Sequence, residues 1–207
     1  MATSLPAPAI SDGLFFVWVG ANDLGINFTR GTSADSNVPA QAAARIGDAL
    51  DQLYDAGARH FLVPNLPDRG LTPSGAANPF ATGATLAFNQ ALEAELASRR
   101  LQWGDAQVLS FDTFTLFAQV AANPGLYGFT NVSQPCYTGP LLGGVPDSLC
   151  ADPDAHLFWD GLHPTSSAHA LLGQGFAKTV RDASVPEPAM LLLTMLGVAG
   201  VLRRRRR

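Results

Sequence analysis

Apolar residues follow two different patterns along the chain, and the two patterns alternate. The continuous apolar run 14–19, which ends at Gly20, predicts a strand buried on both of its faces. Apolar residues at helical spacing predict a helix over 38–56, stopped by Gly57. By the same patterns we expect strands over 59–67 and 106–112, helices over 84–100, 113–122 and 165–181, and a loop-rich stretch over 123–154. Thr165 is the expected cap of the last helix.

The order of these elements indicates the fold class. Strands that alternate with helices of about ten or more residues predict an α/β sandwich with a parallel sheet. In such sheets, active-site residues gather at the carboxyl ends of the strands. The stretch Gly20-Ala21-Asn22-Asp23 follows the first strand directly, where a catalytic loop is expected.

Composition narrows the class of protein. Hydrophobic residues make up 47% of the 207 residues and charged residues 14%, as in a globular protein with a buried core. Five of the 13 basic residues form the terminal run 203–207, so the rest of the chain is clearly acidic. An acidic body offers no face for nucleic acid, and we expect no nucleic-acid partner.

The C-terminal segment 183–207 differs from the body, which we expect to form one domain over 1–182. An uncharged apolar run, 189–202, precedes the arginine cluster 203–207. As a helix it would extend about 21 Å, less than the roughly 30 Å of a hydrocarbon core. The arginine cluster nevertheless favours a membrane helix whose cations stay on the cytoplasmic side. A basic tail that binds nucleic acid is the alternative, but it leaves the apolar run unexplained.

Cys136 and Cys150 lie 14 positions apart in a segment rich in glycine, proline and serine. We expect a loop disulfide, which requires an oxidising compartment, and two free cysteines are the alternative. A zinc site is not expected, because no third or fourth thiol lies nearby. His156, Asp160 and His163 could be imagined as metal ligands, but the acidic stretch before them reads more simply as a loop. We therefore expect neither a metal nor a cofactor.

Asp160 and His163, in the stretch FWDGLHPT, are the first candidates for chemistry. A histidine can take the proton of a nucleophile while a carboxylate on its other ring nitrogen fixes its tautomer. An aspartate that caps a helix beside a surface histidine is the simpler alternative. Asn22 is the second candidate, because a side-chain amide just past a strand can donate to a developing oxyanion. Its alternative is an Asx-turn, in which Asn22 and Asp23 bond their own backbone.

Taken together, these motifs resemble the SGNH/GDSL family of serine esterases and lipases. The resemblance rests on Gly20-x-Asn22-Asp23 and on Asp160-x-x-His163-Pro164, and it spans roughly 14–181. It implies a flavodoxin-like three-layer α/β/α sandwich and hydrolysis of a lipid, carbohydrate or small-molecule ester without a metal. It also implies that Asn22 is the side-chain oxyanion donor, with Gly20 a backbone position of the motif. His163 would be the base and Asp160 the group that orients it.

The chain departs from the family pattern near its start. The family's nucleophile lies in a Gly-Asp-Ser motif after its first strand, and that motif is absent here. Ser11-Asp12 falls before the strand that leads to Gly20, which is the wrong place. We expect that the nucleophile, the first strands and a signal peptide lie upstream of Met1. The truncated chain would then hydrolyse no esters alone, and its strand at Leu14 would form an exposed hydrophobic edge.

The tail carries a second resemblance. Val185-Pro186-Glu187-Pro188, the apolar run and the arginine cluster together are similar to the PEP-CTERM sorting signal of Gram-negative bacteria. This resemblance implies export, anchoring in the inner membrane, processing by an exosortase-type enzyme, and a final place at the cell surface or in the extracellular matrix. Two readings stay open beside an exported hydrolase. One is a non-catalytic surface module that binds a carbohydrate or acyl ester, and the other is a fragment without an independent fold.

Overall fold

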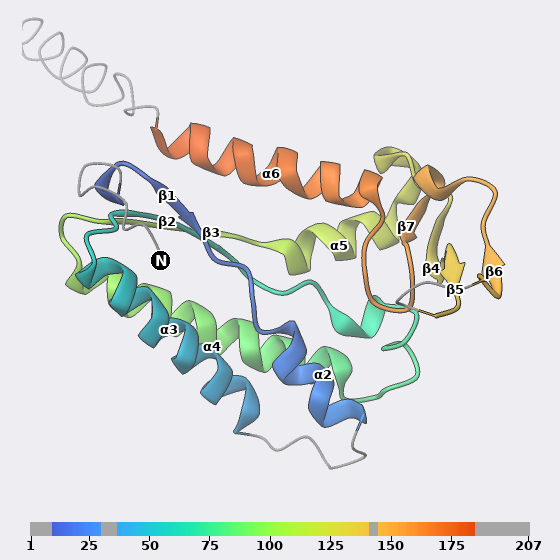
Figure 1. Cartoon of the computed structure of the whole chain (residues 1–207), viewed down its shortest axis with the longest axis horizontal. Helices are drawn as coiled ribbons and strands as arrows, with labels where there is room; N and C mark the ends of the chain where they lie inside the picture. Colours follow the sequence, from blue (N-terminus) through green and yellow to red (C-terminus); the bar gives the residue numbers. More distant parts are fainter. Residues whose placement is uncertain (1–9, 30–36, 141–144, 185–207) are drawn as a thin grey trace, which may run out of the picture.

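A parallel three-stranded sheet forms the centre of the computed structural model, which describes residues 10–29, 37–140 and 145–184 (Figure 1). Its strands are β1 (Leu14–Phe16), β2 (His60–Pro64) and β3 (Gln107–Phe111), hydrogen-bonded in that order. Phe15 pairs with Phe61, and Phe61 pairs with Val108. Both pairings are parallel, so the expected α/β fold with a parallel sheet is confirmed.

Helices cover both faces of this sheet. Figure 1 shows α3 (Val38–Asp55) and α4 (Ala81–Gln102) on one face, and α5 (Thr113–Ala122) and α6 (Ser166–Ser184) on the other. Each of the four overlaps a helix that the spacing of apolar residues predicts. The layers are therefore helix, sheet and helix.

The described residues form two apolar core clusters, one with the helices on each side of the sheet. In the first cluster, α3 and α4 pack against one face of β2. Its residues Leu50, Phe61 and Phe88 are fully buried. The second joins α5 and α6 to a pair of short strands, with Phe117 and Phe158 at its centre. Trp18, which follows β1, packs against both clusters.

Among the described strands, β1 forms the exposed hydrophobic edge that was expected at Leu14, and it is less buried than its apolar run alone predicts. Leu14 and Phe16 are each 47% exposed, so the expected burial on both faces is wrong. β1 pairs only with β2 among the described strands. Phe15 points to the opposite face and packs against the first cluster.

The stretch 123–154 holds more regular structure than the loop expected there. β4 (Asn131–Pro135) pairs in parallel with β7 (His156–Phe158), and β5 (Tyr137–Thr138) pairs antiparallel with β6 (Ser148–Leu149). Short 3-10 helices occur at η2 (Pro124–Tyr127) and η3 (Pro153–Ala155).

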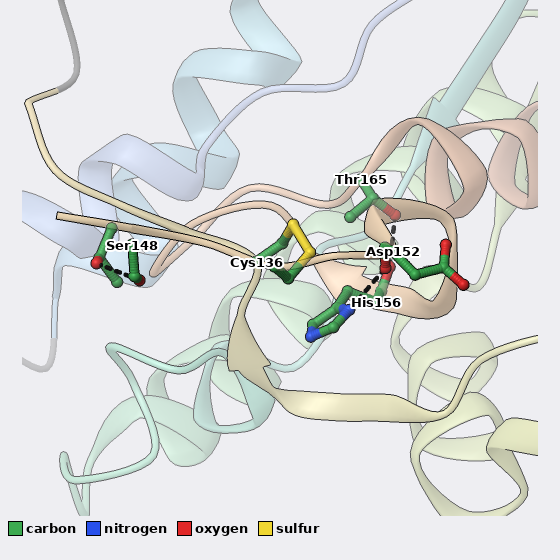
Figure 2. Close-up of a disulfide and its surroundings, with 7 residues drawn as sticks. Cys136, Ser148, Asp152, His156 and Thr165 are labelled. Atoms are coloured by element: carbon green, nitrogen blue, oxygen red, sulfur yellow. Dashed lines mark hydrogen bonds between the residues drawn. A yellow bond between two sulfur atoms is a disulfide. The ribbon is translucent and has the colours of Figure 1, made fainter. Parts of the chain in front are cut away.

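Cys136 and Cys150 form a disulfide at the β5–β6 hairpin, which confirms the predicted pairing (Figure 2). Thr165 caps α6 as expected, because its hydroxyl accepts the Ala168 N–H at 3.3 Å. The same hydroxyl donates to the His156 carbonyl at 2.7 Å, as Figure 2 shows. The start of α6 is therefore attached to β7.

The sequence predicts a membrane helix over 189–202. The apolar run 189–202 and the arginine cluster 203–207 lie outside the described residues. Among the helices that are described, none is long and apolar enough to span a membrane.

Candidate active site

Asp160 and His163 lie in one turn between β7 and α6, and their side chains are in contact. Nδ1 of His163 lies 2.8 Å from Oδ2 and 3.0 Å from Oδ1 of Asp160. Because an ionised carboxylate can only accept, the proton of a neutral His163 ring belongs on Nδ1. Nε2 is then left with a free lone pair, as a general base requires. The i,i+3 contact that the sequence suggested is therefore present.

The Asp160 carboxylate is held more firmly than the histidine ring. Oδ1 accepts the backbone N–H groups of Leu162 at 2.8 Å and His163 at 2.7 Å. The Asp160 side chain is only 13% exposed, whereas that of His163 is 67% exposed. Burial tends to raise the pKa of Asp160, but these backbone donors and the His163 ring outweigh it and lower the pKa. Asp160 thus stays ionised while the His163 ring remains accessible to solvent.

Backbone contacts between the flanking residues close the acid–base turn (residues 160–163). The Trp159 N–H donates to the His163 carbonyl at 2.8 Å, and Phe158 forms a β-bridge with Pro164. Phe158 is buried in the second cluster. Asp160 therefore caps its own turn, while Thr165 caps α6, so the alternative of a helix-capping aspartate does not describe the site.

Gly20 stands at the carboxyl end of the β1 segment in a conformation that favours glycine. Its φ is +111°, and a Cβ at this position would lie 2.4 Å from Cζ of Phe88. The close approach of α4 therefore excludes a side chain here. The chain then enters a helix, α2 (Ala21–Thr29), where the sequence had suggested a loop.

Asn22 lies in the first turn of α2 and is exposed. The hydrogen bonds among the described residues include none to its side-chain amide, so the Asx-turn alternative is not seen for Asn22. Asp23 accepts from Arg45 on α3 at 3.1 Å. A side-chain amide carries two N–H donors and, when exposed, can donate them to an anion. The structure joins this region to the acid–base turn through residues 68–75, which contact Ala21 and Gly161.

A polar network that sequence reasoning missed connects the ends of β2 and β3. The Asn65 amide donates to Asp112 at 2.9 Å and accepts from the Thr113 hydroxyl at 2.8 Å. Asp112 also caps α5 through the Thr115 N–H at 3.0 Å. Burial tends to raise the pKa of Asp112, but the bonds from Thr115 and Asn65 outweigh it and lower the pKa. An Asn and an Asp directly after two parallel strands were the signal that could have identified this network.

Comparison with known proteins shows the family of this chain. The family model of the GDSL-like lipase/acylhydrolases matches residues 6–176. This chain belongs to that family. It is 26% identical over 186 residues to the GDSL esterase/lipase LIP-4 of Arabidopsis thaliana, covering 78% of this chain and 50% of that protein. It is also 30% identical over 186 residues to the anther-specific proline-rich protein APG of the same plant, covering 82% and 35% respectively. The chain thus spans about half the length, or less, of the curated relatives it matches.

A second family model matches the tail. The PEP-CTERM protein-sorting motif covers residues 184–207, so the chain carries the sorting signal that its sequence suggested. The GDSL match ends before this segment begins.

GDSL-family hydrolases act on ester bonds, and their chemistry requires a nucleophile beside the base. Within the part of the chain that is described, no hydroxyl is hydrogen-bonded to the His163 ring. Ser11 donates to Asp12 at 3.2 Å, and both precede β1, so they lie at the amino end of that strand. The loop between β7 and α6, which holds Asp160 and His163, lies toward the carboxyl ends of the sheet strands in Figure 1, where α/β sheets usually bind their ligands.

The candidate metal ligands do not converge. Over residues 10–29, 37–140 and 145–184, no three His, Cys, Asp or Glu side chains come close enough to hold a metal ion. His156 has its Nδ1 3.0 Å from the Asp152 carbonyl oxygen (Figure 2). Asp160 is paired with His163 instead.

Proposed function

We propose that this chain is the acid–base and oxyanion-binding part of an exported ester hydrolase of the GDSL type. His163 is the general base, Asp160 orients it, Asn22 donates to the oxyanion, and Gly20 shapes the turn before it. The observation that carries the proposal is the 2.8 Å contact between Nδ1 of His163 and Oδ2 of Asp160. This contact leaves Nε2 free on an exposed ring.

The chemistry follows from the positions of these groups. Nε2 of His163 takes the proton of an attacking serine hydroxyl, and the Asp160 carboxylate stabilises the imidazolium that forms. The hydroxyl oxygen bonds to the ester carbonyl carbon, and Asn22 donates to the resulting oxyanion. A donor of this kind lowers the barrier by about 3–4 kcal/mol. His163 then protonates the departing alcohol, and the acyl-serine is hydrolysed by water in a second round.

We also propose that this chain alone does not hydrolyse esters. This proposal is supported by the absence, within the described residues, of a hydroxyl hydrogen-bonded to His163. The test is hydrolysis of p-nitrophenyl butyrate by the purified chain and by His163→Ala. We expect no sustained turnover by either protein. Sustained turnover that His163→Ala abolishes would overturn this part of the proposal. Ser74→Ala would then test whether Ser74, whose backbone N–H donates to the Gly161 carbonyl, acts as the nucleophile.

The hydrolase assignment has its own test. The reading frame upstream of Met1 is sequenced, and any coding extension is expressed in front of this chain. An extension that restores hydrolysis, lost again in His163→Ala, supports the assignment. An extended protein that binds esters but never cleaves them contradicts it.

We propose further that residues 183–207 direct export and a transient membrane anchor. The apolar run 189–202 inserts in the inner membrane, the arginine cluster 203–207 stays cytoplasmic, and an exosortase-type enzyme processes the protein for the cell surface. The match to the PEP-CTERM motif supports this proposal. The test is fractionation of the producing bacterium with the full chain and with 185–207 deleted. We expect the deletion to remove the protein from the membrane and surface fractions.

One observation favours a second candidate, a non-catalytic module that binds an ester or a sugar. The ring of Trp159, which is 38% exposed, stacks on Tyr137 beside the acid–base turn. Such a platform can bind an apolar or carbohydrate ring without cleaving it. Saturable quenching of tryptophan fluorescence by a p-nitrophenyl ester, lost in Trp159→Ala and accompanied by no hydrolysis in the extended protein, would favour this candidate.

A further inference from the structure

The two halves of the candidate site belong to different apolar clusters. Asn22 precedes Leu24, which is buried in the first cluster. The acid–base turn follows Phe158, which is buried in the second. Because a displacement of about 1 Å between reacting groups can cost about a hundredfold in rate, the two clusters need a connection that fixes their relative position.

Residues 68–75, which we name the bridge segment, contact both halves. Nη1 of Arg69 donates to the Ala21 carbonyl, next to Asn22, at 3.3 Å. Nη2 of the same guanidinium lies 3.5 Å from where a Cβ on Gly25 would stand, so the group packs along the first turns of α2. At the other end, the Ser74 N–H donates to the Gly161 carbonyl at 2.9 Å. In Figure 1 this segment, which includes η1 (Arg69–Leu71), passes between α2 and the loop that enters α6.

Hydrogen bonds between its own residues hold the bridge segment in one conformation. The Thr72 hydroxyl donates to the Arg69 carbonyl at 2.8 Å and accepts the Gly75 N–H at 3.0 Å. A Cβ on Gly75 would lie 1.8 Å from the Arg69 carbonyl oxygen, so only glycine fits this turn. Thr72 is 5% exposed, which shields its hydrogen bonds from water. The segment therefore has little freedom to change its length.

The bridge segment is also fixed to α4 along its middle. The Asp68 carboxylate accepts the Gly70 N–H at 2.8 Å and the Thr82 hydroxyl at 3.1 Å. The Arg69 N–H donates to the hydroxyl of Thr85, which is fully buried on α4. These bonds attach the bridge segment to α4.

We propose that the bridge segment is a strut that sets the distance between Asn22 and His163, and that Arg69 is the positioning residue for Asn22. Arg69 supplies a side-chain bond to the α2 end, whereas Ser74 supplies a backbone bond to the acid–base turn. The functional meaning of this strut rests on the proposed hydrolase site. Its role in fixing the distance between the two halves does not rest on that site, and this distance is measured without any substrate.

The test measures the separation of the two halves directly. Nitroxide labels are attached through p-acetylphenylalanine at the exposed positions of Asn22 and Leu162, which leaves the disulfide intact. Electron paramagnetic resonance then gives the distance distribution in the full chain. We expect Arg69→Met and Thr72→Val each to broaden this distribution at least twofold. Arg45→Met is the matched control, because it also removes a guanidinium bond to α2 but lies outside the bridge.

The outcomes separate the strut from general loosening. An unchanged distribution in Arg69→Met overturns the proposal, and so does equal broadening in Arg45→Met. Arg69→Lys, which keeps a donor near the Ala21 carbonyl, is expected to restore part of the narrow distribution. Should Thr72→Val fail to fold, Arg69→Met still decides.

A kinetic measurement on an extended, active protein separates this inference from the proposed function. There Arg69→Met is expected to lower kcat about tenfold or more while KM changes less than twofold. An extended protein without any hydrolysis contradicts the proposed function but leaves the distance result standing.

Discussion

The indole ring of Trp159 stacks on the phenol ring of Tyr137, with the ring centroids 5.5 Å apart and the planes 3° from parallel. Tyr137 follows Cys136, whose disulfide with Cys150 closes the β5–β6 hairpin. Trp159 precedes Asp160 directly. The Tyr137 N–H also donates to the Trp159 carbonyl at 2.6 Å. The disulfide hairpin and the acid–base turn are therefore joined by ring and backbone contacts.

Reduction of the disulfide is expected to destabilise the protein and loosen the Trp159 ring. Opening a loop of this length removes about 3 kcal/mol from the free energy of unfolding. Urea unfolding with and without a dithiol measures the loss, and a red shift of tryptophan emission reports the ring. The double variant Cys136→Ser with Cys150→Ser is the control and should not respond to the dithiol. An unfolding midpoint that reduction leaves unchanged contradicts the prediction.

The charge of Asp160 is expected to stabilise the fold in a pH-dependent way. Its folded-state pKa is lowered, despite burial, by the His163 and Leu162 N–H donors. The stabilisation is therefore complete above the unfolded aspartate pKa of about 3.9 and is lost as pH falls through the still lower folded value. Asp160→Asn keeps an acceptor oxygen but removes the charge. We expect it to lose about 1 kcal/mol at pH 7 and progressively less as the pH falls below the unfolded aspartate pKa of about 3.9.

Urea unfolding of both proteins at a series of pH values measures this difference. Asp48→Asn, which removes an exposed carboxylate on α3, corrects for the loss of one negative charge. A gap between wild type and Asp160→Asn that stays constant from pH 7 to pH 3 would show that the charge contributes nothing.

Local patterns in the sequence predicted the elements whose signals are themselves local. Helices α3 to α6 and strands β2 and β3 follow from apolar spacing that persists over one element. The contact between Asp160 and His163 follows from a separation of three residues, which one turn spans. Gly20 at a strand end likewise marked the turn before Asn22.

The remaining features depend on residues far apart in the chain. The exposure of Leu14 depends on which strands flank β1, so the local apolar run predicted burial and only the family's strand order predicted an exposed edge. β4 and β7 are short strands that pair Asn131 with His156, across a stretch that reads as loop. The bridge segment meets the acid–base turn through a backbone bond from Ser74, and a backbone bond leaves no signature in residue type.

Gly20→Ala is expected to be strongly destabilising, in contrast to Gly173→Ala. At Gly20 the methyl group would meet the Phe88 ring at 2.4 Å, at a φ of +111°. Backbone strain and overpacking together cost about 3 kcal/mol. At Gly173, inside α6, a Cβ meets nothing within 4 Å, so alanine should add up to about 1 kcal/mol. Urea unfolding of both variants decides, and a Gly20→Ala protein as stable as wild type refutes the close approach.

The outer edges of the described sheet differ in their protection. On β3, the Arg100 guanidinium donates to the Val108 carbonyl at 2.8 Å and so covers a backbone group of that edge. On β1, the Val17 N–H bonds Leu62 of β2, so in a parallel ladder the backbone groups of Phe16 face away from the sheet. Unpaired strand edges with apolar side chains favour pairing with another chain.

Leu14→Lys is therefore expected to reduce self-association of the purified chain. Leu14 is 47% exposed on the β1 edge, and a lysine there places a charge where two copies would meet. Sedimentation velocity over a tenfold concentration range should show the wild-type mass rising and the Leu14→Lys mass staying closer to that of one chain. Leu101→Lys is the matched control, because Leu101 is 88% exposed near the end of α4, away from that edge. If Leu101→Lys lowers the mass as much as Leu14→Lys, association is a matter of net charge, and the β1 edge is not the contact.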